Sequence, residues 1–191
     1  MSAPVKNKKI YTAEDLLKMS DGKSYELEDG KLVRRPMGVE SSWIGGILYA
    51  LLLNFCRAHN LGWVLPADAS YQCFPTSPNK VRKPDVSFIR RGRLPGERLP
   101  KGHCPIAPDL AVEVTSPRDL SSRTIKKIQE YLQAGVSLVW LVDPGTRIVQ
   151  IHRKDSPIIV LHENDELTGE DVLPGFRCRV SEILPPPAAT E

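Results

Sequence analysis

LAVEV at residues 110–114 and LVWLV at residues 138–142 are the two stretches that decide the fold. Each is short, nearly all apolar and rich in β-branched residues, which is typical of a strand buried inside a sheet. The segment between them has the apolar spacing of a helix. The sequence therefore predicts a strand–helix–strand unit at the centre of an α/β (α+β) fold.

The predicted helix covers about residues 121–134, and Gly135 follows it as a C′ residue. One face of this helix carries four apolar residues, Ile125, Ile128, Tyr131 and Leu132. Lys127 flanks that face, whereas Lys126 points more nearly outward. Lys127 could lay its stem along the core and bring its ammonium to a site beside the sheet. The alternative is an ordinary solvated lysine.

Three elements are predicted in the first third of the chain. Thr12 caps a short helix, AEDLLKM, because its hydroxyl can accept a free backbone N–H. Asp29-Gly30 joins two short extended runs into a hairpin, since both residues tolerate positive φ, and Glu26 lies on the first of these strands. From residue 41 to 57, apolar residues recur at intervals of three and four, which predicts the longest helix of this part.

The middle of the chain alternates between strand candidates and breaks. The candidates are residues 63–65, 71–74 and 86–89. Residues 90–108 contain four prolines and three glycines and are predicted to form a loop. After the second apolar run, Asp143-Pro144-Gly145 turns the chain into RIVQIH, which we expect to pair antiparallel with that run.

Length and composition are those of a globular protein with its own core. With 191 residues, we predict one domain over residues 11–184, a flexible basic N-terminus at 1–10 and a flexible proline-rich tail at 185–191. The four cysteines form no CxxC pair, which argues against a zinc ribbon or a disulfide framework. There is no signal-peptide pattern, and the longest apolar stretch, residues 47–53, is too short for a bilayer. We expect a cytoplasmic protein without a membrane partner.

The formal net charge of +3 is compatible with nucleic acid but decides little. Local basic clusters are more informative, and they lie at residues 80–83, 90–93 and 126–127. Either these clusters are solvated surface, or some of them position a nucleic-acid backbone. The candidate contacts are Arg82, Lys83, Arg90, Arg91 and Arg93.

Glu113 is a carboxylate in the middle of a strand that otherwise looks buried. Burial of an unpaired carboxylate is costly, so such a residue usually has a cation, a metal or a strong hydrogen-bond partner. Asp85 begins the apolar run VSFI directly after Pro84. If the two strands are neighbours, two carboxylates at matching height could share one hard cation. The alternatives are an arginine-paired Glu113 and an Asp85 that only begins a strand.

A family resemblance joins these residues. The motifs are KPDV at 83–86, DLAVEVTSP at 109–117, KIQEYLQAGV at 127–136 and VWLVDP at 139–144. In this order they resemble the Uma-two family, a bacterial branch of the PD-(D/E)xK restriction-endonuclease-like superfamily. The hairpin ELEDGKLV and the helix MGVESSWIGGILYALL extend the resemblance over most of the chain. The resemblance implies a restriction-endonuclease-like fold, with helices flanking a mixed central β-sheet.

The resemblance also implies roles for individual residues. Asp85 and Glu113 would be catalytic metal ligands, and Val114 would offer its backbone carbonyl. Glu26 would be an accessory acid. The superfamily lysine stands two residues after the acid, where this chain has Thr115, an accessory position; Lys127 would supply the catalytic lysine from the helix. Relatives have a histidine near residues 41 and 42, where this chain has two serines.

The activity that the resemblance implies is metal-dependent hydrolysis of phosphodiester bonds, and DNA is the expected substrate. Mg²⁺ is the expected cofactor and Mn²⁺ its substitute, since hard cations bind one or two carboxylates and keep several waters. A homodimer is an expectation from the family and from the apolar residues Trp43 and Trp63. The competing hypothesis is a catalytically silent nuclease fold that binds nucleic acid or protein.

Overall fold

The protein is described by a computed structural model that covers residues 9–35, 38–116 and 121–187. Its centre is a six-stranded sheet, and the strands follow in spatial order as β3 (Gly62–Pro66), β4 (Val86–Arg90), β5 (Leu110–Val114), β6 (Leu138–Asp143), β7 (Ile148–His152) and β8 (Ile159–Leu161). The pair β5–β6 is parallel and every other neighbouring pair of this sheet is antiparallel. The predicted mixed central sheet is confirmed.

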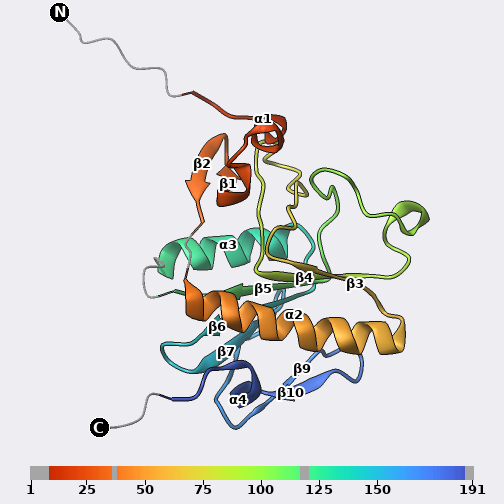
Figure 1. The fold of residues 1–191 in the computed structure, drawn as a ribbon, viewed down its shortest axis with the longest axis vertical. Helices are drawn as coiled ribbons and strands as arrows, with labels where there is room; N and C mark the ends of the chain where they lie inside the picture. The colour runs from red at the N-terminus through yellow and green to blue at the C-terminus, as the bar shows by residue number, and fades with distance from the viewer. Residues whose placement is uncertain (1–8, 36–37, 117–120, 188–191) are drawn as a thin grey trace, which may run out of the picture.

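Two long helices cover the two faces of this sheet. Helix α3 (Ser121–Gln133) connects β5 to β6 and lies on the same side as the N-terminal hairpin, whereas α2 (Val39–His59) covers the other side (Figure 1). Alternation along β5 explains the division, because neighbouring side chains of a strand point to opposite faces. Val112 packs in the cluster under α2, and Ala111 packs in the cluster under α3.

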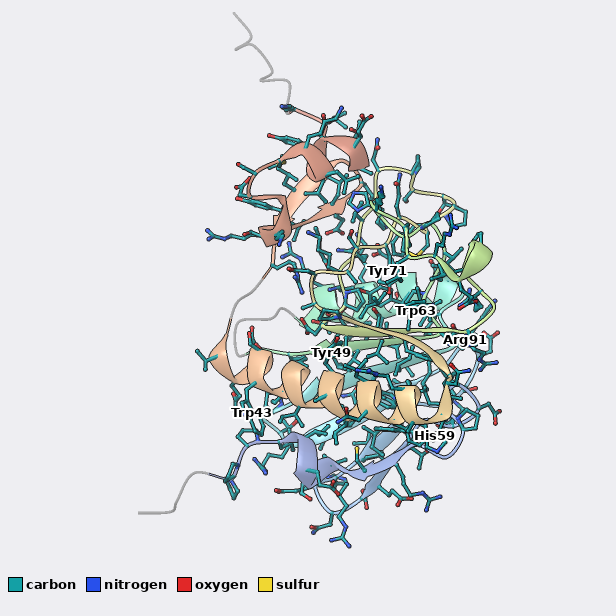
Figure 2. All side chains as sticks on the ribbon, turned by 45° about the vertical axis from the view of Figure 1, so that its right-hand side comes forward. Trp43, Tyr49, His59, Trp63, Tyr71 and Arg91 are labelled. Carbon is teal, nitrogen blue, oxygen red and sulfur yellow. The ribbon has the colours of Figure 1, made fainter. Side chains whose placement is uncertain are left out.

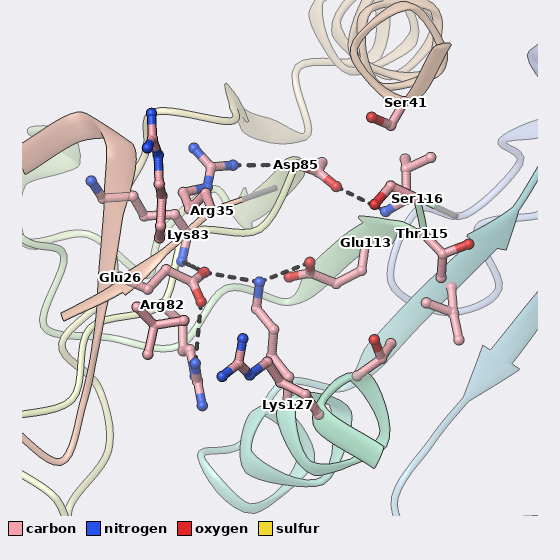
Figure 3. A pocket seen from close by; sticks show the side chains of 16 residues that line it. Glu26, Arg35, Ser41, Arg82, Lys83, Asp85, Glu113, Thr115, Ser116 and Lys127 are labelled. Atoms are coloured by element: carbon pink, nitrogen blue, oxygen red, sulfur yellow. Dashed lines mark hydrogen bonds and ion pairs between the residues drawn. The ribbon is translucent and has the colours of Figure 1, made fainter. Parts of the chain in front are cut away.

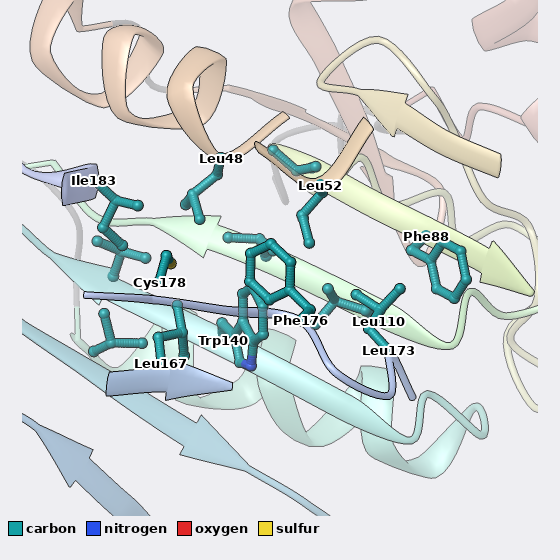
Figure 4. Close-up of a cluster of buried hydrophobic side chains, with 14 of the residues drawn as sticks. Leu48, Leu52, Phe88, Leu110, Trp140, Leu167, Leu173, Phe176, Cys178 and Ile183 are labelled. Carbon is teal, nitrogen blue, oxygen red and sulfur yellow. The ribbon is translucent and has the colours of Figure 1, made fainter. Parts of the chain in front are cut away.

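The core under α2 is extended by the C-terminal part of the chain. Strands β9 (Glu166–Thr168) and β10 (Arg177–Arg179) pair antiparallel, and α4 (Val180–Ile183) follows. Trp140 of β6 stacks on Phe176 with 5.9 Å between ring centroids (Figure 4). These elements have no counterpart among the sequence predictions, because three-residue strands are too short to show a periodicity.

The N-terminal elements follow the sequence prediction closely. Thr12 caps α1 (Ala13–Lys18) in a reciprocal capping box with Asp15. A short 3₁₀ turn, η1 (Gly22–Ser24), leads into the hairpin of β1 (Tyr25–Glu28) and β2 (Lys31–Arg34). At its turn Asp29 and Gly30 have φ of 49° and 82°, the left-handed region that the Asp-Gly pair predicts.

Two local predictions are wrong. Residues 71–74 form no strand, since Tyr71 makes only isolated bridges to Arg82 and Cys104 and Pro75 follows at once. Ile125 is 53% exposed, because α3 joins the apolar cluster through residues from Ile128 onward. The predicted loop at residues 90–108 contains one 3₁₀ turn, η2 (Pro95–Glu97).

By length and composition α2 could cross a membrane, with a mean hydropathy of 1.3. Its apolar face instead packs on the sheet: Ile44, Leu48, Leu52 and Cys56 are buried in the core. Figure 2 labels Trp43, Tyr49 and His59, which follow one another along this helix. The predicted flexible ends fall largely outside the described residues, which omit 1–8 and 188–191, and the domain limits stay a prediction.

Candidate active site

Strand pairing brings Asp85 and Glu113 together. Val86 of β4 pairs with Val112 of β5, and one further step in this register places Asp85 opposite Glu113. The Asp85 N–H donates to the Val112 carbonyl at 2.9 Å, and the Val114 N–H donates to Oδ2 of Asp85 at 2.8 Å. The two acids therefore lie side by side at one end of two adjacent strands (Figure 3), as the sequence predicts.

Lys127 reaches the same point from α3. Its Nζ lies 2.8 Å from Oε2 of Glu113 and 2.8 Å from Oε1 of Glu26, and its side chain is only 14% exposed. The neighbouring Lys126 is 52% exposed and binds Glu28. The helix-face assignment made from the sequence, with Lys127 inward and Lys126 outward, agrees with these contacts.

Glu26 joins the hairpin to this cluster. Strand β1 is held in place because Leu27 bridges Val81, which brings the segment before β4 alongside the hairpin. The Lys83 N–H then donates to Oε1 of Glu26 at 2.7 Å, and Nη1 of Arg82 donates to Oε2 at 3.1 Å. Glu26 is buried and bridges two cations, Arg82 and Lys127.

The basic cluster at residues 80–83 is buried, so the alternative that it forms solvated surface is wrong. Arg82 is 1% exposed, and its guanidinium donates to Oε2 of Glu130 at 2.9 and 2.5 Å as well as to Glu26. Lys80 donates to Oε1 of Glu130 at 2.5 Å. Burial is tolerated because each charge meets an opposite one in a low-dielectric interior.

Lys83 is also buried, and its ammonium turns away from the two acids. It donates to the carbonyl of Gly22 at 2.7 Å and so closes the end of η1. Arg82 and Lys83 line the site, but their charges already have protein partners, which argues against the predicted contact with a nucleic-acid backbone.

Arg90, Arg91 and Arg93 lie at the other end of β4 from Asp85. A strand of five residues spans roughly 16 Å, so the structure does not bring these arginines to the two acids. Each guanidinium donates a hydrogen bond to a backbone carbonyl, of Asp171, Asn60 and Ala107 respectively. These arginines therefore connect neighbouring loops by hydrogen bonds.

Thr115, the accessory position, lines the site from the end of β5. Its backbone N–H donates to the Val142 carbonyl at 2.8 Å, and its hydroxyl donates to Asp143 at 3.2 Å. Ser41 lines the site from the first turn of α2, and its hydroxyl donates to the Gly38 carbonyl at 3.2 Å.

Two residues of the site were missed by sequence reasoning. Arg35, which follows β2, donates from Nη2 to Oδ1 of Asp85 at 3.3 Å. Nothing in its local sequence signals this contact. The Tyr131 hydroxyl donates to Oε1 of Glu113 at 2.8 Å. Its position four residues after Lys127 was a usable signal, because residues i and i+4 share a helix face.

The charges of the site are strongly perturbed. Burial raises the pKa of Glu113 to about 7, against the opposing effect of Lys127 and with a further contribution from Asp85. Burial likewise raises the pKa of Asp85. Burial of Glu26 by itself would raise its pKa, but the positive charges of Lys127 and Arg82 outweigh this effect, so the pKa of this carboxyl is lowered. The positive charges around Asp85 and Glu113 therefore do not fully stabilise the ionised forms of these two carboxyls.

The two hydrogen-bond donors to Glu113, the Lys127 ammonium and the Tyr131 phenol, keep their protons. Burial lowers the pKa of Lys127, but Glu113 and Glu26 more than compensate, so the pKa is raised and the ammonium stays charged. Burial raises the pKa of Tyr131 well above its ordinary value, and the phenol remains a hydrogen-bond donor. Both groups can therefore donate to Glu113 throughout the neutral pH range.

A cavity of about 90 Å³ opens where these side chains meet, which is room for several water molecules or a hydrated cation. Within residues 9–35, 38–116 and 121–187, no group of three or more His, Cys, Asp or Glu side chains is arranged to hold a metal ion. The candidate ligands are two carboxylates. Their four donors, Arg35, Val114, Tyr131 and Lys127, occupy about half of the acceptor sites that two carboxylates offer. Oxygen ligands with excess negative charge fit a hard divalent cation.

Comparison with known proteins gives the family. The model of the Uma2 family, described as "Putative restriction endonuclease", matches residues 13–181. Among solved structures, a protein from Anabaena variabilis described as "a putative nuclease belonging to DUF820" has a similar fold, with a TM-score of 0.76 and 20% identity over 90% of this chain and 96% of that chain. A search of curated proteins gave no match. The family description supports a nuclease-like function, and because the match covers most of the sequence, the chain belongs to the Uma2 family.

Proposed function

We propose that this protein is a metal-dependent endonuclease that hydrolyses phosphodiester bonds in DNA. The observation that carries the proposal is the meeting of Asp85 and Glu113 on adjacent strands, with the Lys127 ammonium 2.8 Å from Glu113, beside one small cavity. Two carboxylates and a lysine of this kind can bind a cation and stabilise negative charge on a phosphoryl group.

Asp85 and Glu113 would hold the cation, and the Val114 carbonyl would complete the protein ligands. We propose Mg²⁺, with Mn²⁺ as a substitute, because Mg²⁺ binds through one or two carboxylates and otherwise keeps its waters. When bound, the ion supplies Lewis-acid polarisation of the phosphoryl group and lowers the pKa of the attacking water. Because burial raises the pKa of Glu113 to about 7, the ion would displace a proton from this carboxyl when it binds below that pH.

The protein groups would divide the remaining work. Lys127 would orient the attacking water or stabilise charge that develops on the phosphoryl oxygens. Glu26 and Tyr131 would be positioning residues: Glu26 holds the Lys127 ammonium, and Tyr131 fixes the Glu113 carboxylate. Thr115 would keep the end of β5 in place through Asp143.

The nucleic-acid contacts are reassigned in this proposal. Arg123 lines the cavity and is exposed, so it is better placed to hold a phosphate than the buried Arg82 and Lys83 or the distant Arg90, Arg91 and Arg93. Arg35 also lines the cavity, and its partner there, Asp85, is 3.3 Å away. Arginine suits this role because its planar guanidinium binds phosphate oxygens in pairs. Such contacts supply affinity rather than base specificity.

The test is cleavage of plasmid, linear and single-stranded DNA and of RNA by purified protein. Each substrate is incubated with Mg²⁺, with Mn²⁺ or with EDTA, at fixed salt because phosphate contacts are salt-dependent. We expect cleavage of DNA with either metal and none with EDTA. Equal cleavage with EDTA, or no cleavage of any substrate by a folded protein that binds metal, would contradict the proposal.

The second candidate function is a catalytically silent module that binds nucleic acid or protein. One observation favours it: all four carboxylate oxygens of Asp85 and Glu113 already accept a hydrogen bond from the protein. A silent module would bind DNA equally with Mn²⁺ and with EDTA. Metal titration separates the two candidates, since only the enzyme needs the cation at these acids.

A cytoplasmic location and a homodimer complete the proposal. The four cysteines are free and buried, which suits a reducing compartment. Trp43 is 45% exposed and could contribute to a dimer contact, whereas Trp63 is half-buried and donates to Glu97 at 3.3 Å. Light scattering of the purified protein would test the oligomeric state.

A further inference from the structure

A second, larger cavity of about 430 Å³ adjoins the candidate active site. The two cavities share three lining residues, Arg35, Ser41 and Asp85. The second cavity lies between the first half of α2, the 3₁₀ turn η1 and the segment that follows β3. Its volume is within the range of about 300–1,000 Å³ that small-molecule sites occupy. A molecule bound there would touch Asp85, the candidate metal ligand.

Two consecutive glycines in α2 keep this cavity open. Gly45 and Gly46 both line it, although glycine inside a helix is less stable than alanine. A Cβ atom at Gly46 would meet nothing within 4 Å, and one at Gly45 would make ordinary contact with Asp85 at 3.8 Å. Close packing therefore does not require either glycine. A larger side chain at Gly45 would project toward Asp85, whereas one at Gly46 would enter open space that the cavity lining borders.

The other walls of the cavity combine an aromatic ring with charged groups. Tyr49 lies one turn after Gly45 on α2 and lines the cavity with it. Lys23 and Asp68 approach each other across the cavity lining, with 3.6 Å between Nζ and Oδ2. Arg35 stands between the two cavities. The lining thus holds a ring, two cations with their paired carboxylates Asp68 and Asp85, and small polar groups. The ring and the polar groups match the π-face and polar edges of one base, and the cations match its phosphate.

We propose that the second cavity takes one unpaired nucleotide of the substrate strand, next to the phosphate that Asp85 and Glu113 act on. This inference rests on the proposed nuclease function and names its substrate class. Tyr49 stacks on the base, and Arg35 and Lys23 contact the backbone. A base inside a duplex is covered by its neighbours and its partner, so it enters such a cavity only when it is unpaired or extruded. The enzyme therefore acts on single-stranded or locally opened nucleic acid.

The test fills the cavity without touching the candidate catalytic residues. Gly46→Leu places a side chain in the open space and also raises helix propensity, so the variant is expected to fold. The matched control is Asn54→Leu, which adds the same side chain to an exposed position of α2 about 12 Å further along the helix. Tyr49→Leu and Tyr49→Phe form a second pair, which separates the loss of stacking from the loss of the hydroxyl.

Binding is measured by fluorescence anisotropy, in EDTA, with labelled strands of about twelve nucleotides. The arms are single-stranded DNA, single-stranded RNA and the fully paired DNA duplex. We expect the wild type and Asn54→Leu to bind a single strand more tightly than the duplex. Gly46→Leu and Tyr49→Leu should bind single strands about tenfold more weakly, as expected for one lost base contact, and Tyr49→Phe should not. The tighter of the DNA and RNA arms identifies the natural strand.

Equal binding of single strands by Gly46→Leu and the wild type would overturn the proposal, as would tighter binding of the duplex by the wild type. Cleavage with Mn²⁺ is measured in parallel on the same proteins. Loss of single-strand binding in Gly46→Leu with no cleavage by any protein would contradict the nuclease function and leave the cavity assignment standing. Cleavage at the same rate by Gly46→Leu and the wild type would contradict the cavity assignment and leave the nuclease function standing.

Discussion

Nζ of Lys127 lies 2.8 Å from Oε2 of Glu113, although the two side chains come from α3 and β5. The same ammonium lies 2.8 Å from Oε1 of Glu26, on the N-terminal hairpin. One lysine thus connects three elements and stands between two acids in a largely buried site. Its charge is needed by the fold and, in the proposed mechanism, by the transition state, so variants must separate the two contributions.

Lys127→Met should lower kcat by about a hundredfold or more, because it removes charge stabilisation and keeps most of the side-chain volume. Mn²⁺ binding should persist, since both carboxylate ligands remain. Lys126→Met is the matched control on the exposed side of α3 and should keep nearly full turnover. Single-turnover kinetics on DNA measure both. Wild-type cleavage by Lys127→Met would remove Lys127 from the mechanism.

Asp85→Asn should lose both metal binding and turnover, because it removes a ligand rather than a charge stabiliser. Isothermal titration with Mn²⁺ measures the binding, and Asp68→Asn, in the adjoining cavity, is the control with an unchanged titration. Metal should also raise the melting temperature of the wild type, by a stabilisation of about 2.7 kcal/mol at a metal concentration of 100 times Kd. Equal stabilisation of Asp85→Asn and the wild type would place the metal elsewhere.

Metal affinity should fall with pH below about 7. Burial raises the pKa of Glu113 to about 7 in the metal-free protein, so below that pH the carboxyl holds a proton that the cation must displace. For one displaced proton, the apparent Kd should rise about tenfold for each pH unit below 7 and level off above it. Titrations in two buffers of different ionisation enthalpy count the protons released. A Kd that stays constant between about pH 5.5 and 7 would contradict this assignment.

Arg82→Met should destabilise the fold by about 3–5 kcal/mol, because it leaves the buried Glu26 and Glu130 without their shared cation. Arg90→Met, at the exposed end of β4, should cost less than about 1 kcal/mol. Urea denaturation gives both values. The double variant Arg82→Met with Glu130→Gln should recover part of the loss, since one unpaired charge is removed with its partner. No recovery would mean that Arg82 acts through packing alone.

The sequence by itself determined the local elements of this protein. Strands β5 and β6 follow from their continuous apolar runs, and the inward face of α3 follows from a period of 3.6 residues; both signals depend only on neighbours along the chain. The same is true of the Thr12 cap and the Asp29-Gly30 turn. The motif order also indicated Asp85, Glu113 and Lys127 as one group, and the family match agrees with the resemblance from which it was taken.

Only the tertiary structure decided which charges meet. Arg82 looks like part of a solvated basic run, yet it is buried because Glu26 and Glu130, 56 and 48 residues away, surround it. Arg35 reaches Asp85 across 50 residues, and Arg90 to Arg93 fall at the far end of the strand that begins beside Asp85. Periodicity records which face of an element is apolar, but it carries no information about which distant element supplies the opposite charge. That choice is made when the hairpin, α3 and the sheet pack together.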